Sequence, residues 1–380
     1  MKRIAAKRLA IPSGLLVDPL IAIEGAHILE ISTRSACEIS HLDYDFPDAT
    51  ITAGFLDIHF HGIAGQDVMN ASSEGFREIA HHLARAGVSR FLPTTVTASL
   101  DTTLLSLERM AEYIEAPPFE GTSQALGIHI EGPFLSPAKR GMHPAEHLLL
   151  PSPELLDRFW DAAHGHIRLM TIAPELPGAL ETIKRAAGLG IRSSMGHSMA
   201  TQAEAIAGMQ NGVVSATHTF NAMRAFDHRE PGILGVVLDR DDLYADLICD
   251  GFHVAPEAVR LWLKMKGSER AILITDCLSA AGRPNGAYMA GDTIVHVEGD
   301  ACRTNTGVLA GSIITLDRAV ANLREIARAE VHCVARLASI NPTRMLGLPE
   351  LLEQGAFADF NVYDADGIRR RCFIRGSLIE

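Results

Sequence analysis

The stretch that decides the fold reads Thr52-Ala53-Gly54-Phe55-Leu56-Asp57-Ile58-His59, an apolar run that ends in a histidine. Short apolar or β-branched runs of this kind are typical of buried strands. Similar runs follow at 88–95, 126–129, 167–172, 191–195, 213–217, 243–249 and 271–275. The chain therefore contains eight strand candidates in its central part.

Segments rich in Ala, Leu, Glu and Arg fill most of the gaps between these strands and are predicted to be helices. The clearest run from Glu74 to Ala86, from Glu181 to Ala187 and from Pro256 to Lys266, each followed by a glycine that can end a helix. Strands that alternate with helices in this way predict a (β/α)8 barrel. A doubly wound open sheet has the same alternation, so the order of elements alone does not separate the two folds.

Polar residues at the strand ends favour the barrel. They are His59 and His61, Thr94 and Thr95, His129 and Glu131, Glu175, His197, His218, His253 and Asp276. In a barrel the carboxyl ends of the strands converge on one mouth, where active sites lie. An open sheet would spread these side chains too far apart to act together.

Both ends of the chain have a different rhythm, in which short apolar runs alternate with turn residues. This pattern indicates strands and turns. We therefore expect two domains: a small β-sandwich built from 1–52 plus 350–380, and a metal-dependent hydrolase barrel over 53–349.

Composition excludes several classes of function. The net charge is −12 and the 34 Lys and Arg residues are scattered, which argues against a nucleic-acid partner. No apolar run approaches the roughly 20 residues of a membrane span. The six cysteines form no CxxC pair, which fits free thiols in a reducing compartment and favours the cytoplasm.

The strand ends supply a candidate metal site. Glu131, His197 and His218 offer one carboxylate and two imidazoles, a common set of ligands for a catalytic divalent ion that keeps one position open for water. A lone histidine is more often a hydrogen-bonded structural residue. Their joint occurrence on strand ends favours the metal.

Two further groups extend this site. His59 and His61 lie two residues apart, so both imidazoles face the same side of an extended strand. They can hold a second metal ion or form hydrogen bonds inside the mouth. Asp276 follows a buried apolar run, and beside a metal its carboxylate can take a proton from bound water, whereas elsewhere an aspartate is commonly a helix cap.

Donors for a substrate lie on loops near the predicted mouth. His143, Asn221, Arg229 and His253 occupy such positions. Arg229 can bind a phosphate or carboxylate in bidentate fashion, although its pattern taken alone favours a solvated surface role. His143 can donate a hydrogen bond to a carbonyl oxygen that gains negative charge.

Several motifs resemble the amidohydrolase superfamily and, within it, the N-acetylglucosamine-6-phosphate deacetylase family. They are 54–62 (GFLDIHFHG), 91–95 (FLPTT), 129–134 (HIEGPF), 196–198 (GHS), 217–223 (THTFNAM), 229–232 (REPG), 250–254 (DGFHV), 275–276 (TD) and 309–312 (LAGS). The resemblance covers nearly the whole chain. It implies hydrolysis of the acetamide of N-acetylglucosamine 6-phosphate to glucosamine 6-phosphate and acetate, in amino-sugar catabolism or recycling, and a homodimer.

The resemblance also implies roles for individual residues. Glu131, His197 and His218 would bind at least one divalent ion, with zinc preferred over iron, cobalt or manganese and a second ion left open. Asp276 would act as general base and then acid, and His143 would polarise the acetyl carbonyl. The substrate would contact Met142, His143, Asn221, Ala222, Arg229, His253, Leu309, Ala310 and Gly311. Arg229 would reach in from the partner subunit.

Three alternatives stay open. A deacetylase of the galactosamine epimer shares these motifs. A cyclic amidase would need a carboxylated lysine on the fourth strand, which instead ends in Ala173-Pro174-Glu175. A barrel that binds a sugar phosphate without turning it over would lack a ligand or a proton carrier. One departure from the family pattern is Cys277-Leu278-Ser279, where relatives carry small residues, so the pocket wall beside Asp276 is predicted to differ.

Overall fold

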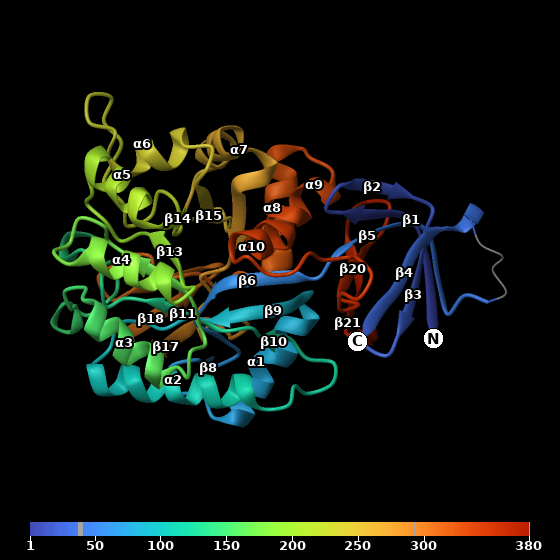
Figure 1. The fold of residues 1–380 in the computed structure, drawn as a ribbon, viewed down its shortest axis with the longest axis horizontal. Coiled ribbons are helices and arrows are strands. Elements are labelled where there is room, and N and C mark those ends of the chain that lie inside the picture. The colour runs from blue at the N-terminus through green and yellow to red at the C-terminus, as the bar shows by residue number, and fades with distance from the viewer. Residues whose placement is uncertain (37–40, 292, 380) are drawn as a thin grey trace.

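The structure is a computed structural model that describes residues 1–36, 41–291 and 293–379 (Figure 1). It has an α/β fold with two separate regions. A curled layer of parallel strands, with helices packed outside it, lies to the left in Figure 1, and a sheet formed by both termini lies to the right. The two ends of the chain are close together in this terminal sheet.

The curled layer consists of two parallel sheets. The first contains β6 (Phe55–Phe60), β9 (Val88–Pro93) and β10 (Gln124–Ala125). The second contains, in order, β11 (Ile128–Glu131), β12 (Ile167–Ile172), β13 (Arg192–Met195), β14 (Val213–Ala216), β15 (Tyr244–Ile248) and β16 (Ala271–Ile274). Each predicted central run overlaps one of these strands, so the predicted parallel α/β pattern is confirmed.

Single parallel bridges connect the two sheets at both of their edges. Thr94 pairs with His129 beyond the end of β9, and Phe60 pairs with Cys277 beyond the end of β16. Backbone hydrogen bonds support both junctions, because Thr95 N donates to His129 O at 2.9 Å and Asp276 N donates to His59 O at 2.9 Å. The carboxyl ends of the first and last strands are thereby held next to each other.

The predicted first strand, 52–59, is divided in the structure. The terminal strand β5 (Tyr44–Ala53) ends one residue before Gly54, and β6 begins one residue after it. A Cβ atom at Gly54 would lie 2.6 Å from Ser89 Oγ, so only glycine permits this close crossing between the two regions. The prediction of a single strand here is wrong because the chain changes sheets at the glycine.

Helices separate the parallel strands as predicted. Their bounds are α1 (Ser73–Arg85), α2 (Leu100–Glu115), α3 (Pro153–Ala162), α4 (Ala179–Gly188), α5 (Gln202–Asn211), α6 (Gly232–Asp239), α7 (Pro256–Arg270), α8 (Leu316–Ala327), α9 (Val331–Ala335) and α10 (Ile340–Met345). Short 3-10 turns cover Arg34–Ala36, Pro137–Lys139, Ala145–His147 and Arg336–Ala338. Regular helical geometry in α7 is broken at the predicted glycine, because Gly267 has φ 63° and ψ −174°.

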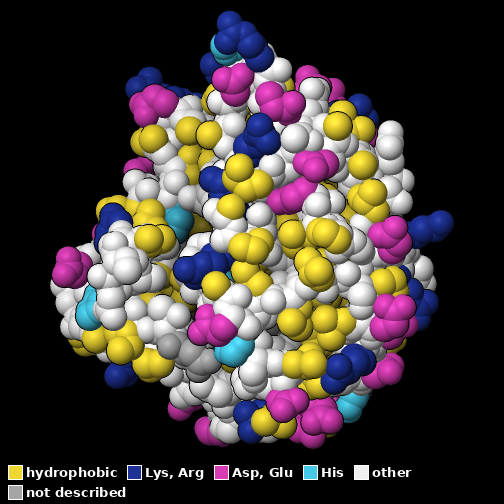
Figure 2. Space-filling model, turned by 90° about the vertical axis from the view of Figure 1, so that its left-hand side faces the viewer, with side chains coloured by type: hydrophobic (Ala, Val, Ile, Leu, Met, Phe, Trp, Pro, Cys, Tyr) yellow, Lys and Arg dark blue, Asp and Glu magenta, His cyan; other side chains and the backbone are white. Residues whose placement is uncertain are grey.

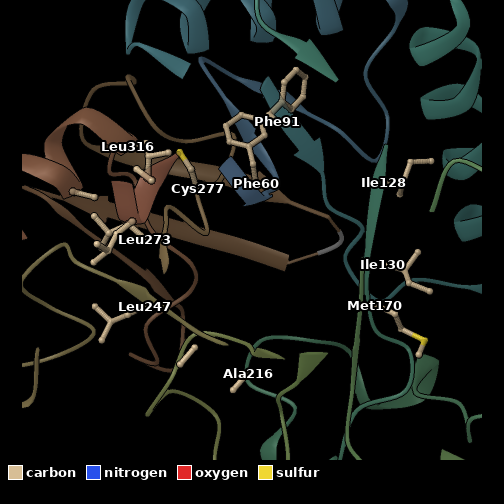
Figure 3. Close-up of a cluster of buried hydrophobic side chains, with 14 of the residues drawn as sticks. Phe60, Phe91, Ile128, Ile130, Met170, Ala216, Leu247, Leu273, Cys277 and Leu316 are labelled. Atoms are coloured by element: carbon tan, nitrogen blue, oxygen red, sulfur yellow. The ribbon is translucent and has the colours of Figure 1, made fainter. Parts of the chain in front are cut away.

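The parallel strands are apolar on both faces, which suits strands covered on both sides. In β12, Met170 packs in the large cluster beneath the helices, whereas Leu169 belongs to a second cluster with Leu56 and Ile274. Figure 3 shows the first cluster, with Phe60 and Phe91 beside each other. The sheet is thus fixed by burial on both faces, and its polar strand ends form the rim.

Strands from both termini pair in one eight-stranded sheet, as their pattern predicts. It contains β1 (Lys2–Ile11), β2 (Gly14–Val17), β3 (Pro19–Glu24), β4 (His27–Thr33), β5, β20 (Phe360–Tyr363), β21 (Arg369–Ile374) and β22 (Ser377–Ile379). The order is β22-β21-β20-β5-β1-β3-β4, with β2 paired to β1. The sheet has its own apolar cluster, which includes Phe360 and Phe373.

Two small sheets were not predicted from the sequence. One pairs β7 (Gly62–Ile63) with β8 (Gln66–Asp67), and the other contains β17 (Gly286–Ala290), β18 (Thr293–Glu298) and β19 (Ala301–Thr304). The second is inserted between β16 and α8, and most of its side chains are at least partly exposed. Among the described helices, none is both long and apolar enough to cross a membrane.

We expect the Phe360→Ala substitution to lower the free energy of unfolding by about 3–5 kcal/mol, because it removes a fully buried ring that stacks on Phe373 at 4.7 Å. Leu29→Ala, at a side chain in the same sheet that is 40% exposed, should change it by less than about 0.5 kcal/mol. Urea unfolding at unchanged slope measures both values. Equal shifts in the two variants would contradict a packing role for Phe360.

Candidate metal centre and catalytic site

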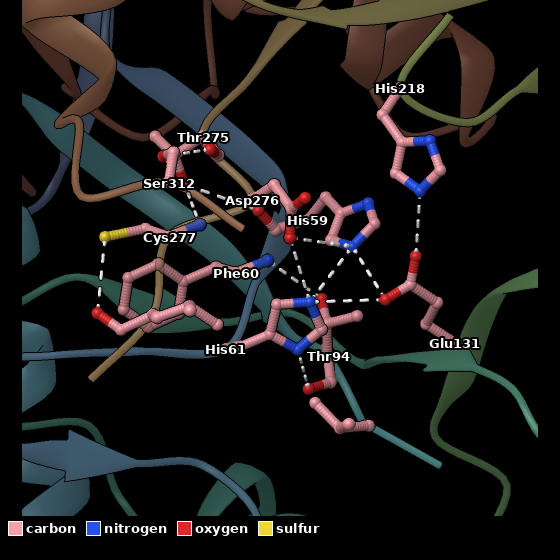
Figure 4. A network of polar contacts seen from close by, with 12 residues as sticks. His59, Phe60, His61, Thr94, Glu131, His218, Thr275, Asp276, Cys277 and Ser312 are labelled. Atoms are coloured by element: carbon pink, nitrogen blue, oxygen red, sulfur yellow. Dashed lines mark hydrogen bonds and ion pairs between the residues drawn. The ribbon is translucent and has the colours of Figure 1, made fainter. Parts of the chain in front are cut away.

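Glu131 contacts several imidazoles at the carboxyl ends of the parallel strands, and Figure 4 shows it beside His59, His61 and His218. It is the last residue of β11, His59 lies in β6, and His61 follows that strand directly. His197 and His218 come two residues after β13 and β14. The structure therefore brings together side chains that are up to 159 positions apart between His59 and His218.

The two oxygens of Glu131 face different pairs of histidines. Oε1 lies 3.2 Å from His197 Nε2 and 3.2 Å from His218 Nε2. Oε2 lies 3.2 Å from His59 Nε2 and 3.3 Å from His61 Nε2. One carboxylate thus joins two groups of nitrogen atoms.

Backbone carbonyls determine which ring nitrogen of three histidines carries the proton. The Nδ1 atom lies 2.8 Å from Lys139 O in His197, 3.2 Å from Asn221 O in His218 and 3.0 Å from Thr94 O in His61. Because a carbonyl oxygen only accepts, Nδ1 must donate, and in the neutral ring Nε2 is left with its lone pair. These lone pairs point at carboxylate oxygens, and a cation is needed to hold them together.

The distances fit a metal ion. His197 Nε2 and His218 Nε2 are 3.0 Å apart, and each is 3.2 Å from Glu131 Oε1. Atoms at this separation can share an ion at about 2.0–2.2 Å from each of them. The carbonyl partners of Nδ1 are the usual second contacts that orient metal-bound histidines.

A second group of ligands lies beside the first. His59, His61 and Asp276 can share an ion, and Asp276 Oδ1 is 3.1 Å from His61 Nε2. Burial alone would lower the pKa of His61, but hydrogen bonds with Asp276 and Glu131 outweigh it and raise that pKa to about 10. The two carboxylates therefore favour positive charge at Nε2, which a divalent ion supplies equally well.

His143 also meets Glu131, yet it carries its proton on the other nitrogen. The backbone N–H of Thr97 donates to His143 Nδ1 at 3.2 Å, so Nε2 bears the hydrogen. That atom lies 3.6 Å from Glu131 Oε2, and burial lowers the pKa of His143 to about 4. Glu131, His143 and His197 lie close enough together to hold a metal ion, but the contact with Thr97 leaves hydrogen on the His143 Nε2 that faces Glu131.

Strained backbone turns several of these side chains into the mouth. His197, His218 and Asp276 have φ values of 47°, 35° and 50°, in the left-handed region that residues other than glycine rarely adopt. The buried carboxylate of Asp246 accepts the backbone N–H of His218 and thereby secures its conformation. Such conformations typically occur at functional sites, where the surrounding structure supports them.

Sequence reasoning missed the residues that orient the cluster. Asp57 accepts a hydrogen bond from Thr275 Oγ1 at 2.6 Å, next to Asp276, and burial raises the pKa of Asp57 to about 6. Thr97 and Asp246 were also missed. Asp57 and Asp246 are polar residues inside apolar strands, a signal that could have identified them, whereas the carbonyls of Lys139 and Asn221 leave no trace in side-chain type.

Two of the polar strand ends lie outside the metal cluster. His129 Nδ1 donates to Ile58 O, and its Nε2 lies 2.8 Å from Thr171 Oγ1, so both ring nitrogens are used by the scaffold. Glu175 accepts hydrogen bonds from Ser198 Oγ at 2.8 Å and Met199 N at 2.6 Å. Each of them supports the loops around the site.

A cavity of about 330 Å³ opens above the cluster. Its lining includes Met142, His143, Asn221, Ala222, His253, Leu309 and Gly311 from the predicted substrate contacts. Ala310 is fully buried behind this wall, and Arg229 lies on an exposed loop away from the cavity. The side chain of Arg229 has no hydrogen-bond or ion-pair partner among the described residues.

The departure at Cys277-Leu278-Ser279 changes one side of the cavity. The side chain of Cys277 belongs to the apolar cluster beneath the helices (Figure 3). Leu278 lines the cavity instead. The wall beside Asp276 is thus apolar. The five described cysteines are all free, and Cys37 lies outside the described residues.

The surface charge near the site is mixed, as the scattered Lys and Arg residues of the sequence predict. In Figure 2, acidic, basic and apolar side chains are interspersed, with no broad basic surface on this face.

His253 Nδ1 is 2.6 Å from Asp250 Oδ2, close to the cavity. Although burial raises the pKa of Asp250, hydrogen bonds from His253 and the loop backbone bring it below its usual value.

Comparisons with known proteins agree with this arrangement. The model of the amidohydrolase family matches residues 50–377. The chain is 35% identical over 316 residues to the N-acetylglucosamine-6-phosphate deacetylase of Lysinibacillus sphaericus, covering 83% of this chain and 80% of that relative. It is 34% identical over 376 residues to the N-acetylgalactosamine-6-phosphate deacetylase of Escherichia coli O157:H7, covering 98% of both.

A solved structure gives the same result. It is a mutant of N-acetyl-D-glucosamine-6-phosphate deacetylase from Mycobacterium smegmatis in complex with N-acetyl-D-glucosamine 6-phosphate. Its TM-score is 0.93 at 29% identity, covering 100% of this chain and 99% of that one. The chain belongs to the amidohydrolase family. Within that family, its relatives named above are deacetylases of N-acetylhexosamine 6-phosphates.

We expect the Glu131→Gln variant to lose bound metal, because the amide offers one weaker oxygen ligand and a donor in place of two carboxylate oxygens. Metal analysis of the purified protein should show less than about a tenth of the wild-type content, in keeping with the 10–100-fold losses typical of weaker changes around metal sites. Glu175→Gln, at a strand end outside the cluster, is the matched control and should keep its metal. Full metal content in Glu131→Gln would exclude the site.

Proposed function

We propose that this chain hydrolyses the acetamide of N-acetyl-D-glucosamine 6-phosphate to D-glucosamine 6-phosphate and acetate. The observation that carries the proposal is the Glu131 carboxylate, which lies between two pairs of imidazoles. Asp276 and the neutral donor His143 line the same cavity. The names of the relatives support the substrate. Amino-sugar catabolism or recycling is the corresponding role.

Glu131, His197 and His218 are proposed to hold one divalent ion, preferably zinc, with iron, cobalt and manganese compatible with the same mixed nitrogen and oxygen ligands. When bound, such an ion lowers the pKa of a coordinated water from about 15.7 towards 7. His59 and His61 can hold a second ion together with Asp276 and the other oxygen of Glu131. The number of ions per subunit is therefore one or two.

Asp276 is proposed to move the protons. Burial acts to raise its pKa, but the charge of His59 and a hydrogen bond from His61 outweigh burial and bring the pKa to about 2. The carboxylate is therefore ionised and can accept a proton from the attacking water. It can then give this proton to the leaving nitrogen of the amino sugar.

His143 is proposed to stabilise the negative charge that develops on the acetyl oxygen. Its Nε2–H points into the cavity because Thr97 occupies Nδ1. A neutral donor fixed before the reaction stabilises this charge without reorganisation. Because Nε2 carries hydrogen in this neutral ring, the nitrogen does not compete with the Glu131 and Asp276 carboxylates as a metal ligand.

The phosphate is proposed to bind near Asn221, Ala222 and His253 on the cavity wall. Arg229 cannot line this cavity from its own chain in the described structure, because it lies on an exposed loop. We propose that it reaches the phosphate of a partner subunit in a homodimer. Its free guanidinium suits bidentate contact with a phosphate.

The galactosamine epimer is the second candidate substrate. The galactosamine enzyme of Escherichia coli O157:H7 supports it, because its identity to this chain, 34%, is close to the 35% of the glucosamine enzyme. The two sugars differ only in the orientation of one hydroxyl group. The reaction at the acetamide is the same for both.

The finer architecture is also proposed here. We infer that the two parallel sheets close into a (β/α)8 barrel, which the bridges at Thr94 and Phe60 support. The barrel would span 53–349, and the sheet of 1–52 plus 350–380 would fold over its own core as a small β-sandwich. The free thiols suit the cytoplasm as its location.

Replacement of Asp276 by Asn should lower kcat by about 10²- to 10⁴-fold, because the amide can neither take nor return the proton. The measurement is acetate release from N-acetylglucosamine 6-phosphate, with metal content determined on the same sample. The matched control is Asp250→Asn, which lies beside the cavity and should weaken substrate binding more than turnover. Retained turnover in Asp276→Asn would refute the proposed base.

The phosphate assignment predicts that the enzyme prefers phosphorylated substrates and depends on Arg229. Rates for N-acetylglucosamine 6-phosphate, its galactosamine epimer and unphosphorylated N-acetylglucosamine should be compared in wild type and Arg229→Gln. We expect Arg229→Gln to raise KM for both phosphorylated sugars by about tenfold or more, because a charged hydrogen bond to the phosphate is lost. The KM for the unphosphorylated sugar should stay unchanged. Mixing this variant with Asp276→Asn should restore some activity if Arg229 acts across subunits.

A further inference from the structure

A polar groove of about 610 Å³ continues from the catalytic cavity. The two spaces share Gly141, Met142 and Val308 in their linings. The cavity itself, at about 330 Å³, is at the lower end of the range for small-molecule sites. One sugar phosphate would fill it, so the groove is room that the proposed substrate does not use.

Both walls of the groove are extensions of segments that already line the catalytic cavity. One wall is formed by residues 140–142 and 144–147, on either side of His143, which lines the catalytic cavity. Arg140 Nη1 donates to His143 O at 2.6 Å, and His143 N donates to Arg140 O at 3.1 Å, so this turn is fixed at the catalytic donor. The groove therefore meets the cavity at Gly141 and Met142, the two residues before the one proposed to contact the acetyl group.

The other wall is a closed turn between β19 and Leu309. Thr304 N donates to Val308 O at 2.9 Å, and Gly307 N donates to Thr304 O at 2.9 Å. The hydroxyl groups of Thr304 and Thr306 are 2.9 Å apart. This wall presents a fixed row of hydroxyl and amide groups, including Asn305, to the groove.

The lining chemistry selects a polar occupant. Thr293, Thr304, Asn305 and Thr306 offer hydroxyl and amide groups, and Arg140 and Glu146 add a cation and a carboxylate. Ile294 and Val308, which are 44% and 49% exposed, provide apolar surface beside them. Hydroxyl and amide donors next to small apolar surfaces match a sugar ring, whereas a longer aliphatic acyl chain would leave the polar groups unpaired.

The direction of the groove defines where an added group would be attached. The acetamide is on C2 of the hexosamine and is proposed to point to His143, and the groove opens beside that residue at Gly141 and Met142. The ring carbons next to C2 are C1 and C3. We propose that the groove is a second sugar subsite for disaccharide 6-phosphates in which the second sugar is joined through the oxygen on C1 or C3. This assignment rests on the proposed function.

The test compares acetate release from N-acetylglucosamine 6-phosphate with release from two disaccharides that carry a second hexose on O1 or O3 of the same phosphorylated sugar. We expect kcat/KM for at least one disaccharide to be no less than about a tenth of the monosaccharide value, a difference of about 1.4 kcal/mol. A disaccharide value below this for both linkages would overturn the proposal. Failure with the monosaccharide itself would instead concern the proposed deacetylase activity.

Thr306→Trp separates the subsite from the catalytic site, because Thr306 is exposed and lines only the groove. It should lower kcat/KM for the accepted disaccharide by about tenfold or more and leave the monosaccharide within about twofold. Thr306→Ser keeps the hydroxyl and should change neither. Equal losses on both substrates, or no loss on the disaccharide, would overturn the assignment, and unchanged thermal unfolding would exclude a folding defect.

Discussion

The rest of the structure depends on one buried carboxylate, Glu131, which faces two pairs of imidazoles. A carboxylate with 3% exposure is costly unless positive charge compensates for it. Its two oxygens make it a junction, because His197 and His218 meet one of them while His59 and His61 meet the other. The cluster is therefore one electrostatic unit that requires cations.

This unit explains why the strands must meet at both edges. His59 lies on the first parallel strand and Asp276 follows the last, yet His59 Nε2 and Asp276 Oδ1 are 3.5 Å apart. That distance requires the backbone bonds at Phe60 and Thr94, which hold the two sheets together next to the cluster. The apolar clusters on both faces of the strands make this arrangement rigid. Rigid support in turn allows His218 to keep its unfavourable backbone conformation.

The sequence was sufficient for the strand order and the principal charged and imidazole groups, because both leave strong patterns. Alternating apolar runs and helices predicted the parallel α/β arrangement, and polar strand ends predicted Glu131, His197 and His218 together. It was insufficient at Gly54, where one apolar run spans two strands. Both strands are buried and apolar there, so the sequence pattern does not show where one ends and the next begins. It also missed β17 to β19, whose short, largely exposed strands have a weak apolar signal, and Asp246, whose role appears only when it meets the N–H of His218.

The assignment of chemical roles depends on hydrogen bonds that residue types cannot reveal. His143, His197 and His218 are all buried histidines near Glu131, but a backbone N–H fixes the first and carbonyl oxygens fix the other two. A donor at Nδ1 leaves hydrogen on Nε2, and an acceptor at Nδ1 leaves a lone pair there. The fold thus uses identical side chains for opposite purposes. His143 presents a hydrogen to the cavity because the Thr97 N–H occupies its Nδ1, whereas its neighbours present lone pairs that can bind a cation.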